Sequence, residues 1–479
     1  MNLTTTKILS RIFAFVFILL PIVGYAGLCS ATFTIEDEIT LGKEFYEKLR
    51  GKDLFVDNPK VCDYINRLGQ KLVKQGQDQS PFDFTFTAIK DSGINAFATP
   101  GGYVYVFSGL IGITENESQL AGVLAHEIAH VKARHIAKTI EKSQKISMAT
   151  LAAVLAGAFL GGSAEASAAV TSFSVATAST LNLKYSREHE EEADRMGMSY
   201  LLDAGYDGRG MYDFLKIMRT YEFYSNSVPS YFLTHPGTSD RISYLDGLLH
   251  VRNREGGAEN ITGNYDRVKT ILYLDDKNPD VKITALTTKL KKNPDDLEAL
   301  YGLAVMQSKT GKIIESIEYF NRALSLSPGD SDILRDLGIT YFHTGEIGKA
   351  IDTLRKAYMI DTKDSDTILY LGRAYEVSGD YSAALNLYKE YQKGNADNID
   401  FYHELAMMYG KLGNHVESHY NFGIYFKKKN KLESALFHFK AAMEHLSPES
   451  EIAVKIRKEM ESIKAPKQKS NKKPHPLNK

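Results

Sequence analysis

The sequence predicts an α+β fold, in which a mostly helical unit is built on a small β-sheet and is followed by an all-α solenoid. Residues 82–87 and 103–107 alternate in the way that half-buried strands do. Residues 120–131 place apolar side chains at helical spacing, and the C-terminal half repeats every 34 residues. A chain of 479 residues is also too long for one typical core, so two or three domains are expected.

Composition excludes few classes of function. The chain is 43% hydrophobic and 24% charged, which is ordinary for a globular protein. Its formal net charge of -1 gives no general argument for a nucleic-acid partner. The two cysteines, Cys29 and Cys62, could pair only if the N-terminus folded back, so no structural disulfide framework is expected.

The N-terminus has the pattern of a secretion signal. Lys7 and Arg11 precede the apolar stretch Ile12–Leu28, and no acidic residue occurs within or before it. This pattern predicts a signal peptide over residues 1–26. An uncleaved anchor is the main alternative, because the uncharged stretch is long enough to span a bilayer. A lipid anchor on Cys29 is disfavoured, since a leucine stands before it where a small residue is expected.

Two alternating segments predict a small sheet. Phe82–Thr87 and Tyr103–Phe107 are expected to be strands, and Gly101–Gly102 is expected to form the tight turn before the second one. The second strand should run directly into the helix that carries His126 and His130. An exposed edge strand of this sheet could pair with the backbone of an extended substrate, although both strands could equally be ordinary half-buried structure.

Two histidines one helical turn apart give the strongest chemical signal. The run Thr114–Glu117 is a capping box, and apolar residues follow at helical spacing, so His126 and His130 face the same way in mid-helix. Imidazoles at this spacing can bind one zinc ion, and the carboxylate of Glu127 can take a proton from water. The motif predicts a zinc metallopeptidase. Alone, it is also compatible with two solvated or core histidines.

A second acidic segment can supply the third ligand that catalytic zinc requires. Ser186–Asp194 opens a helix on which Glu190 and Asp194 lie one turn apart. Glu190 could ligate zinc, while Asp194 could hydrogen-bond the far ring nitrogen of a ligand histidine and fix its tautomer. The alternative is a solvated acidic helix start, which the helix dipole favours.

An apolar insertion, residues 146–183, lies between these two motifs. It is uncharged from Ile146 to Gly162 and again from Ala166 to Leu183. Its apolar part is short of the roughly twenty residues that a membrane span needs. Two interpretations remain open: a mobile hairpin or lid over the zinc site that touches membrane, or a packed pair of helices rich in small residues.

The C-terminal half, residues 283–463, has the 34-residue period of tetratricopeptide repeats. Small residues recur at three places in the repeat, and a bulky apolar residue recurs at a fourth. The four sets are Ala304, Gly338, Gly372 and Ala406; Gly311, Gly345, Gly379 and Gly413; Ser316, Ala350, Ala384 and Ser418; and Phe320, Leu354, Tyr388 and Phe422. Asn430 and Ala435 repeat the glycine-to-alanine interval, so helices should continue to about Met460. Such stacks bind peptides or partner proteins and have no chemistry of their own.

Two further segments are expected to lack a core. Residues 251–282 are expected to be a linker, because Gly256–Gly257 opens a polar stretch. Residues 464–479 hold six lysines and no acid, so we expect a disordered tail. A solvated tail is favoured over one that contacts anionic lipid or an acidic partner.

Four motifs in this order resemble those of the HtpX-type and CAAX-prenyl-protease-type zinc metallopeptidases. They are Asn95–Tyr103; His126–His130; Tyr185–Arg187 with Glu190, Ala193 and Asp194; and Thr234–Pro236 with Arg241. The resemblance implies a zincin-type metallopeptidase domain over residues 33–250 and is specific in these motifs. The combination with a secretion signal and C-terminal repeats is similar to periplasmic members that assist outer-membrane protein assembly.

Carried onto this sequence, the resemblance implies one Zn²⁺ per chain and a role for each motif residue. The zinc ligands would be His126, His130 and Glu190. The other catalytic residues would be Glu127 as general base, Asp194, His235 and Arg241. A neutral imidazole at His235 could donate a hydrogen bond to the oxyanion, or it could occupy the fourth zinc position and inhibit the enzyme. The alternative for His235 is a surface histidine before a proline-glycine turn.

The function that the resemblance implies is a zinc metalloendopeptidase in the periplasm of a Gram-negative bacterium. It would degrade misfolded or stalled envelope proteins and assist outer-membrane protein assembly, with the repeats docking clients or the assembly machinery. No nucleic-acid partner is expected, and peripheral contact with the membrane stays open. The alternative is a chaperone or assembly scaffold that acts through the repeat groove while proteolysis stays latent.

Overall fold

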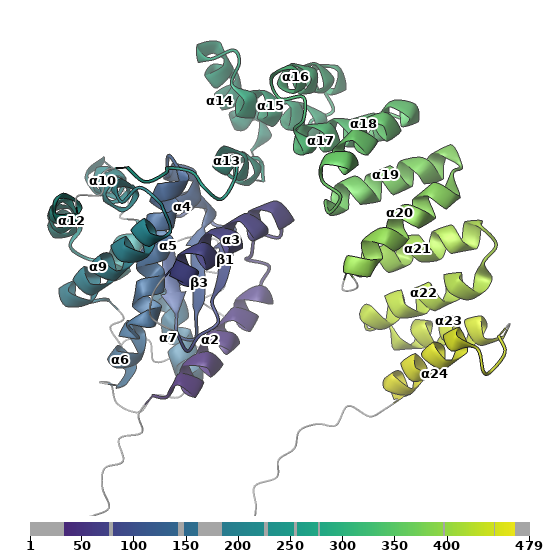
Figure 1. The fold of residues 1–479 in the computed structure, drawn as a ribbon, viewed down its shortest axis with the longest axis horizontal. Coiled ribbons are helices and arrows are strands. Elements are labelled where there is room, and N and C mark those ends of the chain that lie inside the picture. Colours follow the sequence, from purple (N-terminus) through teal and green to yellow (C-terminus); the bar gives the residue numbers. More distant parts are fainter. Residues whose placement is uncertain are drawn as a thin grey trace, which may run out of the picture. The chain divides into compact units, whose positions relative to one another are not determined.

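The computed structural model divides the chain into two compact units, residues 1–275 and 276–479 (Figure 1). It describes residues 33–75, 80–141, 148–160, 184–224, 229–252, 256–275, 278–395, 398–444 and 446–464. The predicted signal peptide and all but the first residue of the predicted tail lie outside these ranges. Within them, no helix combines the length and the apolar character that a membrane crossing requires.

The first unit packs helices around a three-stranded sheet, which confirms the α+β prediction. Its elements are α2 (Ile35–Arg50), α3 (Pro59–Gln75), β1 (Thr85–Ile89), β2 (Ala96–Thr99), β3 (Tyr103–Phe107), α4 (Ser108–Ile113), α5 (Glu117–Lys132), α6 (His135–Glu141), α7 (Met148–Leu160), α9 (Arg187–Asp203), α10 (Arg209–Tyr224), α11 (Tyr231–Thr234), α12 (Thr238–Arg252) and α13 (Tyr265–Leu274). Helix α5 lies at the centre of the unit, because α3, α9, α10 and β2 all pack against it.

The strand order of the sheet is β1-β3-β2. Strand β3 pairs in parallel with β1 and antiparallel with β2. Strand β3 has the predicted bounds, whereas β1 begins at Thr85 instead of Phe82 and runs on to Ile89. Strand β2 has no counterpart in the sequence-based prediction, because all its residues are buried and it therefore lacks alternation.

A tight hairpin joins β2 to β3. Gly101 and Gly102 have φ angles of 85° and 95°, a region that favours glycine. A Cβ atom at Gly101 would lie only 2.7 Å from the carbonyl oxygen of Glu38 in α2. The glycine turn that the sequence predicts is therefore present, and it also lets α2 approach the sheet closely.

Both faces of the sheet are covered by helices. On one face, Val104 and Val106 join a core that includes side chains of α3 and α5. On the other face, Phe97, Tyr105 and Phe107 pack with α2 and α7, and the rings of Phe97 and Tyr105 stack with centroids 4.7 Å apart. The aromatic side of β3 thus faces α2 and α7.

Helix α7 is the described part of the apolar insertion, and it belongs to the core. The ring of Phe159 stacks on Phe97 with centroids 4.6 Å apart, and Nδ2 of Asn95 donates a hydrogen bond to the carbonyl oxygen of Phe159 at 2.8 Å. The interpretation as a mobile lid is therefore wrong for residues 148–160, which form a packed helix. The rest of the predicted insertion, residues 146–147 and 161–183, lies outside the described residues.

Helix α5 begins later than the sequence suggests. Thr114 caps the end of the short helix α4, and the N-cap of α5 is Asn116, whose side-chain oxygen accepts the N–H of Gln119 at 3.1 Å. The predicted capping box at Thr114 is therefore wrong. The predicted direct passage from the second strand into the histidine-bearing helix is also wrong, because α4 separates β3 from α5. The helix nevertheless carries His126 and His130 on one face, as predicted.

Small residues let the neighbouring helices approach α5 closely. A Cβ atom at Gly122 would lie 2.9 Å from the backbone N and Cα atoms of Met211 in α10. A Cβ atom at Gly197 in α9 would lie 3.0 Å from the backbone N of His126. Backbone contacts, which cannot rotate away, therefore fix where the histidine-bearing helix lies relative to α9 and α10.

The first turn of α5 is bonded to a distant part of the chain through one buried carboxylate. Glu117 accepts the backbone N–H groups of Ile261 and Thr262 at 3.1 and 2.8 Å. It also accepts the hydroxyls of Tyr64 and Tyr206. Four donors thus converge on this side chain.

Because of these hydrogen bonds, much of the predicted linker belongs to the first unit. Residues 256–275 of the predicted 251–282 segment belong to the first unit, since residues 261 and 262 bind α5 and helix α13 packs against α3 and α4. The helices of the second unit begin at Pro279, a few residues before the predicted start of the repeats. The polar stretch over residues 256–264 is mostly exposed, but its backbone is held to α5 at residues 261 and 262.

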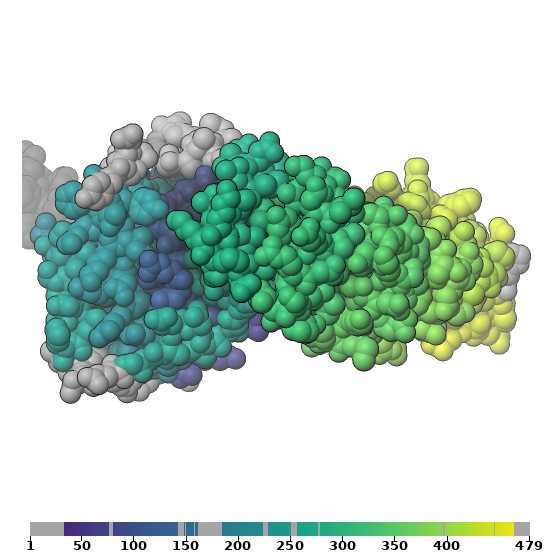
Figure 2. All heavy atoms as spheres, turned by 90° about the horizontal axis from the view of Figure 1, so that it is seen from above, coloured from purple at the N-terminus to yellow at the C-terminus, as the bar shows by residue number. Residues whose placement is uncertain are grey.

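The second unit is a stack of paired helices. Its elements are α14 (Pro279–Lys292), α15 (Leu297–Lys309), α16 (Ile313–Leu326), α17 (Ser331–His343), α18 (Ile347–Ile360), α19 (Ser365–Ser378), α20 (Tyr381–Gly394), α21 (Asp400–Lys411), α22 (His415–Lys428), α23 (Leu432–Met443) and α24 (Glu451–Lys464). Its colours pass in order from green to yellow in Figure 2, because each pair packs on the next. The glycines at 311, 345, 379 and 413 have positive φ and end the first helix of each pair.

The repeated small and large residues meet as the spacing implies, with one exception. A Cβ atom at Gly338 would lie 2.6 Å from Leu354, and one at Gly372 would lie 2.2 Å from Tyr388. Phe422 was expected to fill the same place but is only half-buried. Asn430 has a φ of 58° in the place of the turn glycine, so the additional unit after the fourth repeat is present.

Replacing Gly122 by alanine should destabilise the first unit by about 1–3 kcal/mol, because the added methyl group meets backbone atoms of α10. The matched control is Gly112→Ala in α4, where an added Cβ meets nothing within 4 Å. Urea unfolding of both variants and the wild type would measure the difference. Equal midpoints for the two variants would contradict the packing argument.

Replacing Glu117 by glutamine should destabilise the first unit in a pH-dependent way. Burial raises the pKa of Glu117, but hydrogen bonds from Tyr206, Tyr64 and Thr262 outweigh burial, so the pKa lies below its usual 4.5. A depressed pKa stabilises the folded state above the unfolded-state pKa, and this contribution is lost as the pH falls through the folded-state pKa.

Glu117→Gln should therefore lower the free energy of unfolding by about 1.5–3 kcal/mol at pH 7, and by less at pH 4. Glu259→Gln, an exposed position on the same segment, serves as the control. Denaturant unfolding at both pH values measures the effect. A difference from wild type that stays constant between pH 7 and pH 4 would show that Glu117 is not stabilised as a carboxylate.

Candidate metal centre

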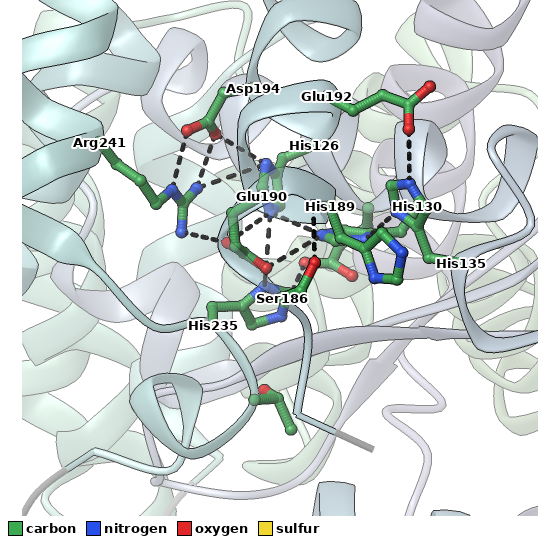
Figure 3. Close-up of polar contacts among 12 residues, drawn as sticks. His126, His130, His135, Ser186, His189, Glu190, Glu192, Asp194, His235 and Arg241 are labelled. Atoms are coloured by element: carbon green, nitrogen blue, oxygen red, sulfur yellow. Dashed lines mark hydrogen bonds and ion pairs between the residues drawn. The ribbon is translucent and has the colours of Figure 1, made fainter. Parts of the chain in front are cut away.

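Four side chains from three separate segments converge inside the first unit (Figure 3). His126 and His130 come from α5, Glu190 comes from α9, and His235 is the residue that ends α11. All four are buried, and each offers one ligand atom, with these atoms within 4.8 Å of one another. The structure thus brings the three predicted ligands together and places His235 with them.

The spacing of the donor atoms fits one small metal ion. The Nε2 atoms of His126 and His130 are 2.9 Å apart, and an oxygen of Glu190 lies 3.5 Å from each of them. Nδ1 of His235 lies 3.4 Å from Nε2 of His126 and 3.1 Å from Oε1 of Glu190. Donors bound at the usual zinc distances around a tetrahedral ion are about 3.3–3.6 Å apart. Three of these five distances lie in this range, whereas the separations of 2.9 and 3.1 Å are shorter. Three imidazoles and one carboxylate are nevertheless donors of the kind that such an ion takes.

Asp194 determines which nitrogen of His126 is free to bind a metal. Oδ1 of Asp194 lies 2.9 Å from Nδ1 of His126. An ionised carboxylate only accepts hydrogen bonds, so we assign the ring hydrogen to Nδ1. The lone pair of Nε2 then points into the cluster. This is the contact that the one-turn spacing of Glu190 and Asp194 predicts.

Arg241 connects the two carboxylates of α9. Its Nη1 lies 2.7 Å from Oε2 of Glu190, and its Nη2 and Nε donate to the two oxygens of Asp194 at 2.7 and 2.8 Å (Figure 3). Burial lowers the pKa of Arg241, but the two carboxylates outweigh burial and raise the pKa still further above its usual range. The guanidinium therefore remains charged, and it balances the carboxylates in the interior.

The charges around the cluster shift the pKa values of its members in opposite directions. Burial and Arg241 lower the pKa of His126, but Asp194 and Glu190 outweigh them and raise it to about 9, so a metal ion that binds Nε2 has to displace a proton from it. Burial raises the pKa of Glu190, but Arg241 together with the three histidines of the cluster outweighs burial and holds the pKa well below its usual value. Glu190 is therefore an ionised carboxylate, the form in which it can bind a metal.

Glu127 lies beside the cluster with a carboxylate that makes no hydrogen bond to any described residue. Its Oε1 is 3.4 Å from Nε2 of His235, which is likewise without a hydrogen bond in the described part of the chain. Burial raises the pKa of Glu127 above its usual value. A buried carboxylate with raised proton affinity and no partner is suited to accept a proton from a substrate water.

The turn after α11 places His235 over the histidine-bearing helix. The ring of Tyr231 stacks on the His235 imidazole with centroids 4.4 Å apart. The backbone N–H of His235 donates to the backbone carbonyl oxygen of Tyr231 at 3.0 Å. Gly237 has a φ of 83° and lets the chain turn at once into α12, which carries Arg241. The predicted turn thus positions two site residues together.

Three residues at the site had not been singled out from the sequence. His135 and Glu192 continue the polar contacts beyond His130 (Figure 3). Tyr185 stacks its ring on His130 with centroids 3.8 Å apart, and its buried hydroxyl has no partner among the described residues. Tyr185 belongs to a motif quoted for the resemblance, so that motif could have drawn attention to it.

The seven residues that the sequence predicts for the site all lie within this cluster or in contact with it. Their roles as ligands, base and supporting groups stay predictions.

Comparison with known proteins agrees with this geometry. Residues 59–249 match the model of peptidase family M48, and residues 297–330 match a tetratricopeptide repeat model. A putative beta-barrel assembly-enhancing protease of Vibrio cholerae is 38% identical over 227 residues, which are 47% of this chain and 46% of that protein. The beta-barrel assembly-enhancing protease of Escherichia coli K12 is 34% identical over 226 residues, with the same coverage.

A mitochondrial metalloendopeptidase, OMA1 of Schizosaccharomyces pombe, is 31% identical over 186 residues, 39% of this chain and 52% of that protein. The chain thus spans about half the length of the curated relatives it matches. The match with the crystal structure of MamA extends over 31% of this chain and 87% of the MamA chain, at 25% sequence identity. Its TM-score of 0.30 establishes no shared overall fold. The chain therefore carries a peptidase family M48 domain at residues 59–249, followed by tetratricopeptide repeats.

Proposed function

We propose that the first unit is a zinc metalloendopeptidase. The observation that carries the proposal is the buried cluster of His126, His130 and Glu190, which lies beside the carboxylate of Glu127. That carboxylate makes no hydrogen bond in the described part of the chain. Two imidazoles and one carboxylate are the ligand set of catalytic zinc in several peptidases. The family M48 match and the relatives named as proteases support the same conclusion.

Different residues of the site would have different roles in peptide-bond hydrolysis. A zinc ion bound at the cluster supplies a Lewis acid that polarises the scissile carbonyl and lowers the pKa of water. Glu127 takes the proton of the attacking water on a carboxylate oxygen and delivers it to the nitrogen of the leaving amine. Asp194 keeps Nδ1 of His126 protonated, and Arg241 holds the carboxylates of Asp194 and Glu190 in position.

In this proposal His235 keeps the enzyme inactive at rest. Its Nδ1 lies at the fourth corner of the donor set, and its Nε2 lies 3.4 Å from Glu127. His235 and Glu127 are 1% and 0% exposed, so a substrate carbonyl gains access only when the turn after α11 moves. Once displaced, the same imidazole can donate a hydrogen bond to the oxyanion.

The predicted signal peptide and the relatives support a proposal for the cellular role. We place the protein in the periplasm of a Gram-negative bacterium, where it degrades misfolded or stalled envelope proteins and assists outer-membrane protein assembly. The beta-barrel assembly-enhancing proteases among its relatives support this role. The tetratricopeptide repeats would dock unfolded clients or the assembly machinery.

The closed site also favours a second candidate function, a chaperone or assembly scaffold with latent proteolysis. The second unit has an open hollow of about 780 Å³ between α20, α21, α22 and the start of α24. Three tyrosines, Tyr402, Tyr409 and Tyr420, contribute to its lining together with Lys389. Such a surface can hold a protein segment without any chemistry at the metal centre.

Cleavage of an unfolded model protein by the chain without residues 1–26 tests the peptidase. Glu127→Gln should lower the rate at least about 10²-fold at unchanged zinc content, because the base is lost while the ligands remain. His235→Ala should raise the rate, since it opens the fourth position. His250→Ala, an exposed histidine on α12, is the matched control. No cleavage by any of these proteins at one zinc per chain would favour the scaffold.

Complementation of a deletion strain separates the two candidate functions. If proteolysis is the role, Glu127→Gln should fail to restore outer-membrane protein assembly. Lys389→Glu in the repeat hollow should then restore it in part, because this change impairs only the delivery of clients to the peptidase. If the scaffold is the role, Glu127→Gln should restore assembly and Lys389→Glu should not. Lys312→Glu, an exposed lysine outside the hollow, is the matched control.

A further inference from the structure

A second imidazole lies behind the ligand histidine His130. His135, the first residue of α6, is fully buried, and its Nδ1 lies 2.8 Å from Nδ1 of His130. Its other ring nitrogen, Nε2, lies 3.1 Å from Oε2 of Glu192 on α9 (Figure 3). The three side chains therefore form a continuous polar chain that runs from the metal cluster to the carboxylate of Glu192.

The negative charge of Glu192 determines which ring nitrogens of His135 and His130 carry a hydrogen. An ionised carboxylate only accepts, so Nε2 of His135 carries the ring hydrogen that is donated to Glu192. Nδ1 of neutral His135 then has a lone pair, and it accepts a hydrogen bond from Nδ1–H of His130. Consequently His130 presents the lone pair of its Nε2 atom to the cluster, where a metal ligand must have it.

The reverse arrangement would disable the site. If Nδ1 of His135 carried the hydrogen, Nδ1 of His130 would accept it, and Nε2 of His130 would hold a hydrogen where the ion should bind. Nε2 of His130 lies 2.9 Å from Nε2 of His126, whose lone pair points into the same space. The tautomer of His130 is therefore as important as its position.

Local structure holds the second imidazole in this place. His135 stacks on the ring of His189 with centroids 4.2 Å apart and an angle of 16° between the planes. The residue before it, Arg134, has a φ of 56°, which turns the chain sharply between α5 and α6. The Arg134 guanidinium bonds Glu38 and the carbonyl oxygen of Phe33, and this anchors the turn that brings His135 back onto His130.

We propose that His135 is a positioning residue for the metal centre, and that His135 together with Glu192 fixes the tautomer of His130. This inference rests on the proposed metal site. It gives the two α5 ligands different supports, since His126 bonds a carboxylate directly and His130 bonds one through another imidazole. The side chain of Glu192 is 39% exposed, so its contribution is screened by solvent and should be smaller than that of His135.

Zinc affinity, measured by competition with a chromophoric chelator on the full mature chain, tests the inference. His135→Phe keeps a ring against His189 but removes the acceptor, and it should weaken zinc binding by about 10–100-fold. His135→Asn offers an amide oxygen near the place of Nδ1 and should restore part of the loss. Glu192→Ala should weaken binding less than His135→Phe, and Glu191→Ala, the exposed neighbour on α9, should not weaken it.

Two spectroscopic measurements keep the test independent of folding defects. With cobalt in place of zinc, His135→Phe should change the visible d–d spectrum, and His135→Asn should return it toward that of wild type. In the zinc form of the ¹⁵N-histidine-labelled wild type, imidazole resonances should show a hydrogen on Nδ1 of His130, with assignment by comparison with His130→Gln.

The outcomes separate this inference from the proposed function. A wild type that binds no zinc would overturn the metal site itself. A wild type that binds zinc, with His135→Phe binding it equally tightly or with Nδ1 of His130 lacking a hydrogen, would overturn only the role of His135.

Discussion

The first unit depends on one buried guanidinium held between two carboxylates of the same helix. Glu190 and Asp194 lie one turn apart on α9, and burial of both charges without compensation would cost several kcal/mol each. Arg241 supplies a planar fork that contacts both of them, with two parallel hydrogen bonds to Asp194 and an ion pair with Glu190. The same contacts leave Asp194 free to bond His126, so charge balance and ligand orientation come from one network.

This network has to sit in the interior, and the packing of α5 makes that possible. The helix is buried along nearly its whole length, with α9 and α10 at backbone distance where Gly122 and Gly197 lack side chains. Close helices bring polar groups from different segments within reach of each other and keep bulk water away. Electrostatic interactions are stronger in such surroundings, which is why the pKa values of Glu190 and His126 depart from their usual values in opposite directions.

The fold class, the repeats and the residues on α5 and α9 could be located from the sequence because local spacings mark them, whereas His235 and Arg241 were assigned only through the family resemblance. His126 and His130 are four apart, as are Glu190 and Asp194, and helix geometry converts that spacing into a shared face. Strand β2 escaped prediction for the opposite reason: it is buried on both sides and has no alternation. His135 and Glu192 escaped because their contact depends on a chain reversal at Arg134, and no fixed spacing encodes that reversal.

The polar segment around residue 260 shows why family boundaries and folding boundaries can differ. Residues 59–249 match the peptidase family, yet Glu117 on α5 receives its backbone donors from Ile261 and Thr262. A fragment that stopped at residue 250 would leave this buried carboxylate without half of its hydrogen bonds, at the first turn of the helix that carries the histidines. The smallest part of the chain that keeps that helix intact therefore extends through α13. Proteolytic cleavage near residue 260 would disturb the metal centre, because it would loosen the first turn of α5.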